Sequence, residues 1–344
     1  MSIKKPAISI LTPVWNGLPY IKECVDSVLM QQFQDWEMII SDNGSTDGTR
    51  DYLDTLNDPR ILVFKQEKNL GIDGNMNFLF SKASTEIAYC LCADDYFYPD
   101  AISRVVNEWT LVPSDTAFIG FNWKEVMKHN INAKFSYDIL PKTLRPGFAQ
   151  LAFFLFGNLP GNLSNVSAKV ACVKEGGFDE SLRMAGDFEI WARLSRTYTM
   201  VLSDTETCFV RRHEGTATSY LFKQGQLFGE HIKIYESLIE ELSAHCDRQK
   251  LIDYFNIELC SYHLRDSIKA ILFGSLKNIK AYLSLESRIF WPKWKRVLGC
   301  LPFALYENGR LMHINSRAAG LLKEFENKPH SVRGTDMSFD ASAK

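Results

Sequence analysis

Three clusters of polar side chains stand out among the first hundred residues, and they offer carboxylate, amide and hydroxyl groups for ligand binding. They run from Thr12 to Asn16, from Asp42 to Asp47, and over the pair Asp94 and Asp95. A single carboxylate after a strand is ordinary, because Asp often begins a turn or caps a helix. Three clusters that meet at one edge of a sheet are harder to explain in that way. They therefore indicate a ligand site.

The elements that must position these clusters follow a βαβα pattern between residues 7 and about 121. Short β-branched runs alternate with apolar residues at helical spacing, which predicts a mostly parallel sheet. The predicted strands span residues 8–11, 36–41, 61–64, 87–92 and 117–121. The clusters follow the first, second and fourth strands. Because ligands bind outside the carboxyl ends of strands in open α/β sheets, all three are expected at the binding edge.

The rest of the chain is less regular. Residues 122 to 215 contain several Gly and Pro, which predicts loops and a smaller mixed sheet. Residues from about 220 to 290 have helical patterning. The polar residues from 329 to 344 predict a disordered tail.

The composition argues against several classes of protein. The chain has 344 residues, with 39 Lys and Arg against 41 Asp and Glu. Nucleic-acid binding normally requires a basic domain or stripe, so this balance argues against it. None of the eight cysteines forms a C-x-x-C pair, so neither a zinc ribbon nor a disulfide framework is expected. We find no signal peptide and no run of 18 apolar residues, and therefore expect the protein in the cytoplasm.

Five motifs occur in an order that resembles family 2 glycosyltransferases of the GT-A fold, of the bacterial surface-polysaccharide type. They are Pro-x-Trp-Asn at 13–16, Asp-Asn-Gly-Ser-Thr-Asp-Gly-Thr at 42–49, Asn-x-Gly at 69–71, Ala-Asp-Asp at 93–95 and Gly-Gly-Phe-Asp-Glu-Ser at 176–181. The resemblance covers about residues 7 to 215. It implies an α/β fold with a Rossmann-like, mostly parallel sheet and helices on both faces. We expect a catalytic domain at 1–215, a helical region at 216–328 and a disordered tail at 329–344.

The resemblance also implies a reaction. A sugar would pass from a UDP- or dTDP-sugar to a hydroxyl of a glycan or lipid-linked glycan. Direct attack by the hydroxyl would invert the configuration at the anomeric carbon. The acceptor would be met at the inner face of the plasma membrane.

Several residues would bind the nucleotide sugar. By resemblance, Trp15 stacks beside the base, and Asp42 accepts the N3 hydrogen of a pyrimidine. The alternative for Trp15 is core packing after the first strand. The other positions expected to contact the donor are Pro13, Asn16, Gly44, Ser45, Asn69, Gly71, Asn75, Ala93, Asp94 and Arg212.

The donor's diphosphate needs countercharge, and the loop at residues 44–48 lacks the Gly-Lys-Ser/Thr ending of a phosphate-binding loop. Mg²⁺ or Mn²⁺ held by carboxylate is the remaining solution. Asp94 matches the metal-binding second acid of the family's Asp-x-Asp motif, and Cys92 stands where the first acid is usual. Asp95 and His213 are the other expected metal ligands. The alternative for the acidic pair is helix capping ahead of Pro99.

Asp187 matches the family's general base, the Asp of a Glu-Asp pair, and Gly186 stands in place of the Glu. A carboxylate is a reasonable base once its environment tunes its pKa. The alternative for Asp187 is capping of the helix that follows.

Two other functions stay open. The departures at Cys92 and Gly186 leave a sugar-nucleotide-binding protein without catalysis as the alternative. A dinucleotide-dependent oxidoreductase is disfavoured, because no Gly-x-Gly-x-x-Gly turn follows the first strand.

A basic aromatic segment lies outside the resemblance. It comprises Arg288, Phe290, Trp291, Lys293, Trp294, Lys295 and Arg296, and residues 297 to 306 are uncharged. Such a segment favours either a peripheral membrane contact or a helix that packs its aromatic side chains on the catalytic domain.

Overall fold

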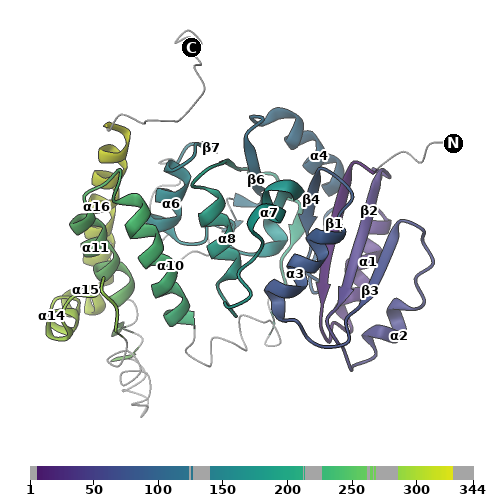
Figure 1. Ribbon diagram of the computed structural model, residues 1–344, viewed down its shortest axis with the longest axis horizontal. Helices are drawn as coiled ribbons and strands as arrows, with labels where there is room; N and C mark the ends of the chain where they lie inside the picture. The colour runs from purple at the N-terminus through teal and green to yellow at the C-terminus, as the bar shows by residue number, and fades with distance from the viewer. Residues whose placement is uncertain are drawn as a thin grey trace, which may run out of the picture.

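The computed structural model describes residues 6–123, 125–126, 140–211, 213, 227–261, 264–265, 267–268 and 286–327. A β-sheet with its covering helices occupies one end of the molecule, and further helices occupy the other (Figure 1). The predicted tail lies outside the described residues, as does the segment 214–226 that holds the expected domain boundary. That boundary stays a prediction.

Eight strands form the main sheet in the order β3-β2-β1-β4-β8-β6-β9-β7. Pairing is parallel for β1 with β2, β1 with β4, β2 with β3 and β6 with β9, and antiparallel for the other neighbours. The strands are β1 (Ile8–Val14), β2 (Trp36–Asp42), β3 (Ile61–Lys65), β4 (Ile87–Cys90), β6 (Thr116–Gly120), β7 (Thr143–Leu144), β8 (Val166–Lys169) and β9 (Thr199–Leu202).

The five strands predicted in the first part of the chain are confirmed, although β4 ends earlier than expected. Leu91 N still donates to Leu11 O at 2.9 Å, but Cys92 N turns away to Ser164 Oγ at 2.9 Å. Strand pairing therefore stops just before the acidic pair.

The smaller mixed sheet expected within residues 122–215 is wrong. The strands β7, β8 and β9 extend the main sheet instead. A short separate sheet does exist, but it joins β5 (Tyr96–Phe97) to β10 (Cys208–Phe209). The strand β8 lies between β4 and β6 and pairs antiparallel with both. Because β8 follows β6 in the chain but lies before it in the sheet, the sequence pattern did not predict one continuous sheet.

Helices cover both faces of the sheet. On β2, Met38 and Ile40 belong to one buried cluster and Ile39 to the other, as expected where side chains alternate along a strand. The first cluster includes residues of α1 and α4, and the second includes residues of α3, α6, α7 and α8. These helices are α1 (Tyr20–Leu29), α3 (Gly71–Lys82), α4 (Ala101–Leu111), α6 (Phe148–Phe156), α7 (Val170–Gly176) and α8 (Gly186–Leu194), with the short α2 (Thr49–Leu53) after β2.

The expected helical region is present at the far end of the molecule. Its helices are α10 (Leu227–Leu242), α11 (Arg248–Phe255) with a π-helical continuation (Asn256–Cys260), α14 (Lys293–Leu298), α15 (Leu301–Leu305) and α16 (Glu307–Asn327). In Figure 1 α10 lies between α8 and α11.

The apolar helix α6 joins the sheet to this helical region, and all of its residues are buried. The ring of Phe153 lies 6.3 Å from that of Phe118 on β6. The ring of Phe154 lies 5.6 Å from those of Tyr235 on α10 and Tyr254 on α11. The buried core therefore continues from the sheet into the helices.

Two partly buried aromatic residues of the basic segment pack against the core. Phe290 stacks on Phe255 of α11 with 5.8 Å between ring centroids. The indole Nε1 of Trp291 donates to Asp253 Oδ1 at 2.9 Å. These aromatic side chains therefore pack on the helical region, whereas the alternative to a membrane contact expected them to pack on the catalytic domain.

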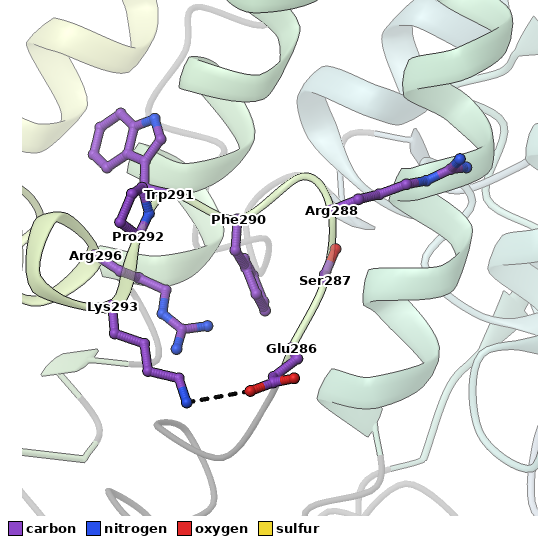
Figure 2. A pocket seen from close by; sticks show the side chains of 8 residues that line it. All are labelled: Glu286, Ser287, Arg288, Phe290, Trp291, Pro292, Lys293 and Arg296. Atoms are coloured by element: carbon purple, nitrogen blue, oxygen red, sulfur yellow. Dashed lines mark hydrogen bonds and ion pairs between the residues drawn. The ribbon is translucent and has the colours of Figure 1, made fainter.

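The same segment forms the rim of a pocket (Figure 2), where Lys293 Nζ pairs with Glu286 Oε1 at 3.3 Å. Trp294 is instead exposed to solvent over 68% of its surface. In the described ranges, no helix has both the length and the apolar character needed to cross a membrane.

Because the core is continuous, we expect Phe154→Ala to destabilise the sheet and the helices together. The lost burial and the cavity should cost about 3–5 kcal/mol. Circular dichroism should show a single thermal transition at a lower temperature. Met30→Ala, at an exposed position, is the control. Two transitions, of which only one moves, would contradict a continuous core.

Candidate functional site

The loop after β1 presents an aromatic ring to solvent at the carboxyl edge of the sheet. Pro13 lies within β1, and Trp15 follows the strand with 58% of its surface exposed. The core-packing alternative for Trp15 is therefore wrong. Asn16 has a φ of 51°, a left-handed conformation that asparagine adopts more readily than most residues.

Hydrogen bonds tie this loop to the loop after β2. Asn16 N donates to Ser45 Oγ at 2.8 Å, and Thr46 N donates to Asn16 Oδ1 at 2.8 Å. Gly17 N donates to Thr49 Oγ1 at 2.9 Å. The first two polar clusters of the sequence thus form one connected unit.

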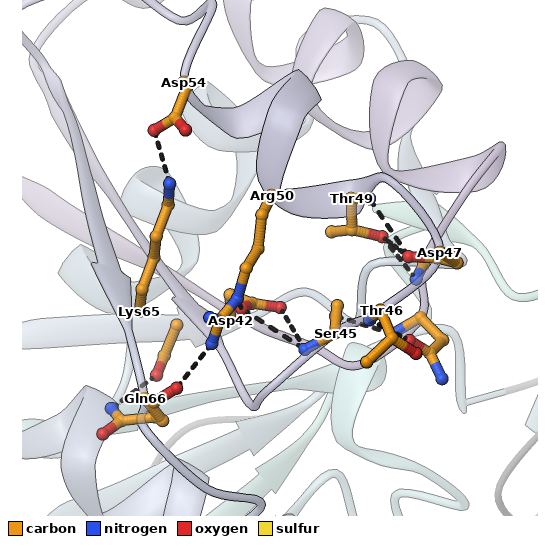
Figure 3. A network of polar contacts seen from close by, with 12 residues as sticks. Asp42, Ser45, Thr46, Asp47, Thr49, Arg50, Asp54, Lys65 and Gln66 are labelled. Carbon is orange, nitrogen blue, oxygen red and sulfur yellow. Dashed lines mark hydrogen bonds and ion pairs between the residues drawn. The ribbon is translucent and has the colours of Figure 1, made fainter.

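Asp42, the last residue of β2, is fully buried beside Arg50 (Figure 3). Arg50 Nε donates to Asp42 Oδ2 at 2.6 Å, and Ser45 N donates to Asp42 Oδ1 at 3.1 Å. Arg50 Nη2 also donates to Gln66 O at 2.5 Å. Because Asp42 is fully buried and bonded to Arg50, its contact with the base of a nucleotide stays a prediction.

The segment that begins at Asn69 lies against the same loop. Asn43 Nδ2 donates to Asn69 Oδ1 at 3.1 Å and to Gly71 O at 3.0 Å. Gly44 has a φ of 85°, and a side chain there would approach Asn69 N to 3.4 Å. Glycine suits this position because it adopts positive φ without strain.

Two predicted donor-binding residues lie below the surface. Asn75 on α3 is 1% exposed, and its Nδ2 donates to Ser41 O at 3.1 Å, which fastens α3 to β2. Ala93 is also buried. Contacts of these two residues with a ligand stay predictions.

An acidic cluster follows β4. The ligand atoms of Cys92, Asp94 and Asp95 all lie within 4.8 Å of one another, a spacing that suits a metal ion. Asp94 is partly exposed, whereas Asp95 is buried. Burial and the charge of Asp94 raise the pKa of Asp95 to about 6. The alternative of helix capping is wrong, because Asp100 occupies the N-cap position of α4.

The segment after β10 folds back over this cluster. Arg211 N donates to Asp95 Oδ1 at 2.8 Å, and Arg211 Nε donates to Asp94 O at 2.9 Å. His213 Nε2 lies 3.2 Å from Asp94 Oδ2, and its ring lies 4.7 Å from that of Tyr20. The structure thus brings together Asp94, Asp95 and His213. Arg212 lies outside the described residues.

Asp187 lies in the first turn of α8, after Ala185 at the N-cap position. Its Oδ2 accepts a hydrogen bond from Asn158 Nδ2 at 2.8 Å, and its Oδ1 accepts one from Phe188 N at 2.8 Å. Burial raises the pKa of Asp187 to about 6, although both hydrogen bonds act in the opposite direction. The carboxylate is therefore a proton acceptor whose pKa lies close to neutrality.

The loop of residues 157–165, between α6 and β8, contacts both acidic groups. Asn158 reaches Asp187, and Ser164 Oγ accepts the hydrogen bond from Cys92 N at the start of the acidic cluster. Asn165 Nδ2 donates to Pro160 O at 2.9 Å and braces the loop. This short loop connects Asp187 to the acids after β4.

Sequence reasoning missed two residues beside Asp187. They are Asn158, in the loop just described, and Asp73, in the first turn of α3. Burial and the charge of Asp187 are the leading causes that raise the pKa of Asp73 to about 8. The Gly and Pro residues around Asn158 predicted only a loop. No sequence pattern pointed to Asp73, because the acids around it come from distant parts of the chain.

Comparisons with known proteins show what the chain is similar to in sequence and fold. Residues 9–161 match the family model described as Glycosyl transferase family 2. An uncharacterized glycosyltransferase of Rickettsia typhi is 24% identical over 254 residues, which are 72% of this chain and 74% of the relative. A putative teichuronic acid biosynthesis glycosyltransferase of Bacillus subtilis is 39% identical over 102 residues, or 29% of this chain and 40% of the relative.

The fold is shared with a solved structure of S. aureus TarS 1-349 in complex with UDP-GlcNAc. The TM-score is 0.56 at 16% identity, and the match covers 93% of this chain and 90% of that chain. An α/β sheet with helices on both faces, the four motifs that follow β1 to β4 and these matches lead to one conclusion. The chain is a glycosyltransferase with the GT-A fold, and its residues 9–161 are similar to glycosyltransferase family 2.

Proposed function

We propose that the protein transfers a sugar from a UDP- or dTDP-sugar to a hydroxyl of a glycan or lipid-linked glycan, with inversion and with Asp187 as general base. The observation that carries this proposal is the loop of residues 157–165, which binds Asp187 at one end and the acidic cluster at the other. A base and the ligands for a metal that would offset the charge of the leaving diphosphate are thus linked through one short loop.

The donor's base would lie at the loops after β1 and β2. Trp15 offers an exposed aromatic face, and stacking on such a face suits any flat base. Asp42 would select a pyrimidine. The solved relative that binds UDP-GlcNAc supports a uridine nucleotide.

The residues after β4 fit a divalent cation, Mg²⁺ or Mn²⁺. Asp94 offers a partly exposed carboxylate, with Asp95, Cys92 and His213 close to it. Carboxylate and imidazole ligands suit such cations. When bound, the metal would offset the charge of the leaving nucleoside diphosphate.

Asp187 would take the proton of the acceptor hydroxyl. With a pKa of about 6 the carboxyl group is ionised at neutral pH, yet basic enough to accept a proton. Asn158 orients Oδ2 and leaves the second lone pair of that oxygen for the hydroxyl. Direct attack in a single displacement inverts the anomeric carbon.

A polysaccharide acceptor is supported by relatives. The Bacillus subtilis relative is named for teichuronic acid biosynthesis. A peripheral contact with the inner membrane face is also part of the proposal. The exposed Trp294, Leu298 and Leu305, next to Lys293 and Lys295, support it.

A panel of UDP- and dTDP-sugars with Mn²⁺ tests the proposal. We expect thermal stabilisation and release of nucleoside diphosphate with one of these donors. Asp187→Asn should lower kcat by about 10²- to 10⁴-fold while donor binding is kept. Asp94→Asn should instead weaken the Mn²⁺-dependent binding. Donor binding without turnover in the wild type would favour the sugar-nucleotide-binding protein, and full turnover of both variants would refute the assigned roles.

The pH profile tests the hydrogen bond to Asp187. Activity should rise with pH through about 6, because the base must be ionised. Asn158→Ala removes a donor that stabilises the carboxylate, so the acid limb of kcat/KM should move upward by about one pH unit. Asn162→Ala, in the same loop, is the control and should leave the limb in place. If the acid limb of Asn158→Ala were unchanged, Asn158 would not influence the pKa of the base.

A further inference from the structure

The backbone of Gly186, directly before Asp187, packs against the carboxyl group of Asp73. A Cβ atom at residue 186 would lie 2.2 Å from Asp73 Oδ2, 2.3 Å from Oδ1 and 2.4 Å from Cγ. No side chain fits there while Asp73 keeps its place. The glycine is therefore required by a side chain that comes from α3.

The fold fixes α3 against the segment that leads into α8. Asn77 Nδ2 donates to Phe178 O at 3.0 Å, and Phe178 N donates back to Asn77 Oδ1 at 2.7 Å. Asn77 Nδ2 also donates to Glu180 Oε1 at 2.9 Å. Asp73 lies one helical turn before Asn77, so these bonds set the position of its carboxyl group beside Gly186.

The helical region also contacts the segment that leads into α8. Glu230 of α10 accepts hydrogen bonds from the backbone N–H groups of Arg183, Met184 and Ala185, at 2.9, 2.9 and 3.0 Å. These residues directly precede Gly186. The start of α8 is therefore clamped between α3 and α10.

We propose that Asp73 takes the place of the Glu that the family resemblance implies at position 186, so that α3 and α8 together build the acidic pair of the active site. Asp73 is then a positioning residue for Asp187. This inference rests on the proposed function, in which Asp187 is the base. It explains why the chain keeps an acidic pair although Gly186 has no side chain.

The two carboxyl groups differ in protonation. Burial, followed by the charges of Asp187, Glu230, Asp179 and Glu189, raises the pKa of Asp73 to about 8. Asp187, with a pKa of about 6, ionises first. Near neutral pH the pair carries one negative charge, and Asp73 is a neutral acid next to an ionised base. Above pH 8 a second charge appears, which should weaken binding of an anionic donor.

An exchange of the two positions tests the proposal. Asp73→Gly should lower kcat by about tenfold or more, because the base loses its neighbour. Gly186→Glu should lower both kcat and thermal stability, because its side chain collides with Asp73. The double variant Asp73→Gly/Gly186→Glu should recover stability and turnover relative to Gly186→Glu alone. Turnover is followed as UDP released from UDP-GlcNAc and from the other donors of the panel, with Mn²⁺.

A pH profile adds a readout that a purely structural role would not move. Asp73→Asn keeps the size of the side chain and stays neutral, so the fall of kcat/KM near pH 8 should disappear while the acid limb near pH 6 remains. Additive losses in the double variant, or an unchanged alkaline limb in Asp73→Asn, would overturn the inference. If Asp187→Asn retained full turnover, the proposed function itself would fail, whatever the Asp73 variants do. The melting temperatures of the wild type, Asp73→Gly, Gly186→Glu and the double variant test the exchange of positions without any donor.

Discussion

Parallel pairing of β1 with β2 and with β4 is the constraint on which the rest of the site depends. Parallel strands end at the same edge, so Val14 lies beside Asp42 in the register, and β4 ends at Cys90 beside Leu11. Each loop that leaves this edge must satisfy its backbone groups without the sheet. Side chains of Asn16, Ser45 and Asn43 do so by bonding to neighbouring loops. The same polar residues that hold the loops together thus create the ligand edge.

Several carboxyl groups of the site are buried, and they differ in the groups that surround them. Asp42 has a guanidinium partner in Arg50. Asp187 accepts hydrogen bonds from the amide of Asn158 and the N–H of Phe188, and burial raises its pKa to about 6 in spite of them. Asp73 lies among other acids, and its pKa rises to about 8. Acids of the same type therefore hold different protonation states near neutral pH, as acid–base chemistry on one fold requires.

The sequence was sufficient for the parts of the fold and site that depend on local pattern. The five strands predicted up to residue 121 follow from periodicity, and the acids after β4 follow from their place at a strand end. For Trp15, the resemblance pointed to the base, whereas the pattern alone left core packing open. The single eight-stranded sheet was not predictable in this way, because β8 enters antiparallel between strands that come earlier in the chain. Asp73 was missed for a related reason. Its role depends on contact with Gly186, and neither residue is unusual in its own segment.

The central claim is that a metal-bound nucleotide lies at the edge formed by the loops after β1, β2 and β4. Anomalous diffraction from crystals of the full chain grown with UDP and Mn²⁺ tests it most directly. The account predicts one manganese peak about 2.0–2.2 Å from a carboxylate oxygen of Asp94 and from diphosphate oxygens, a distance typical of small divalent cations. It also predicts the uracil ring against Trp15. UDP bound at another edge, or manganese bound away from Asp94, would contradict the account.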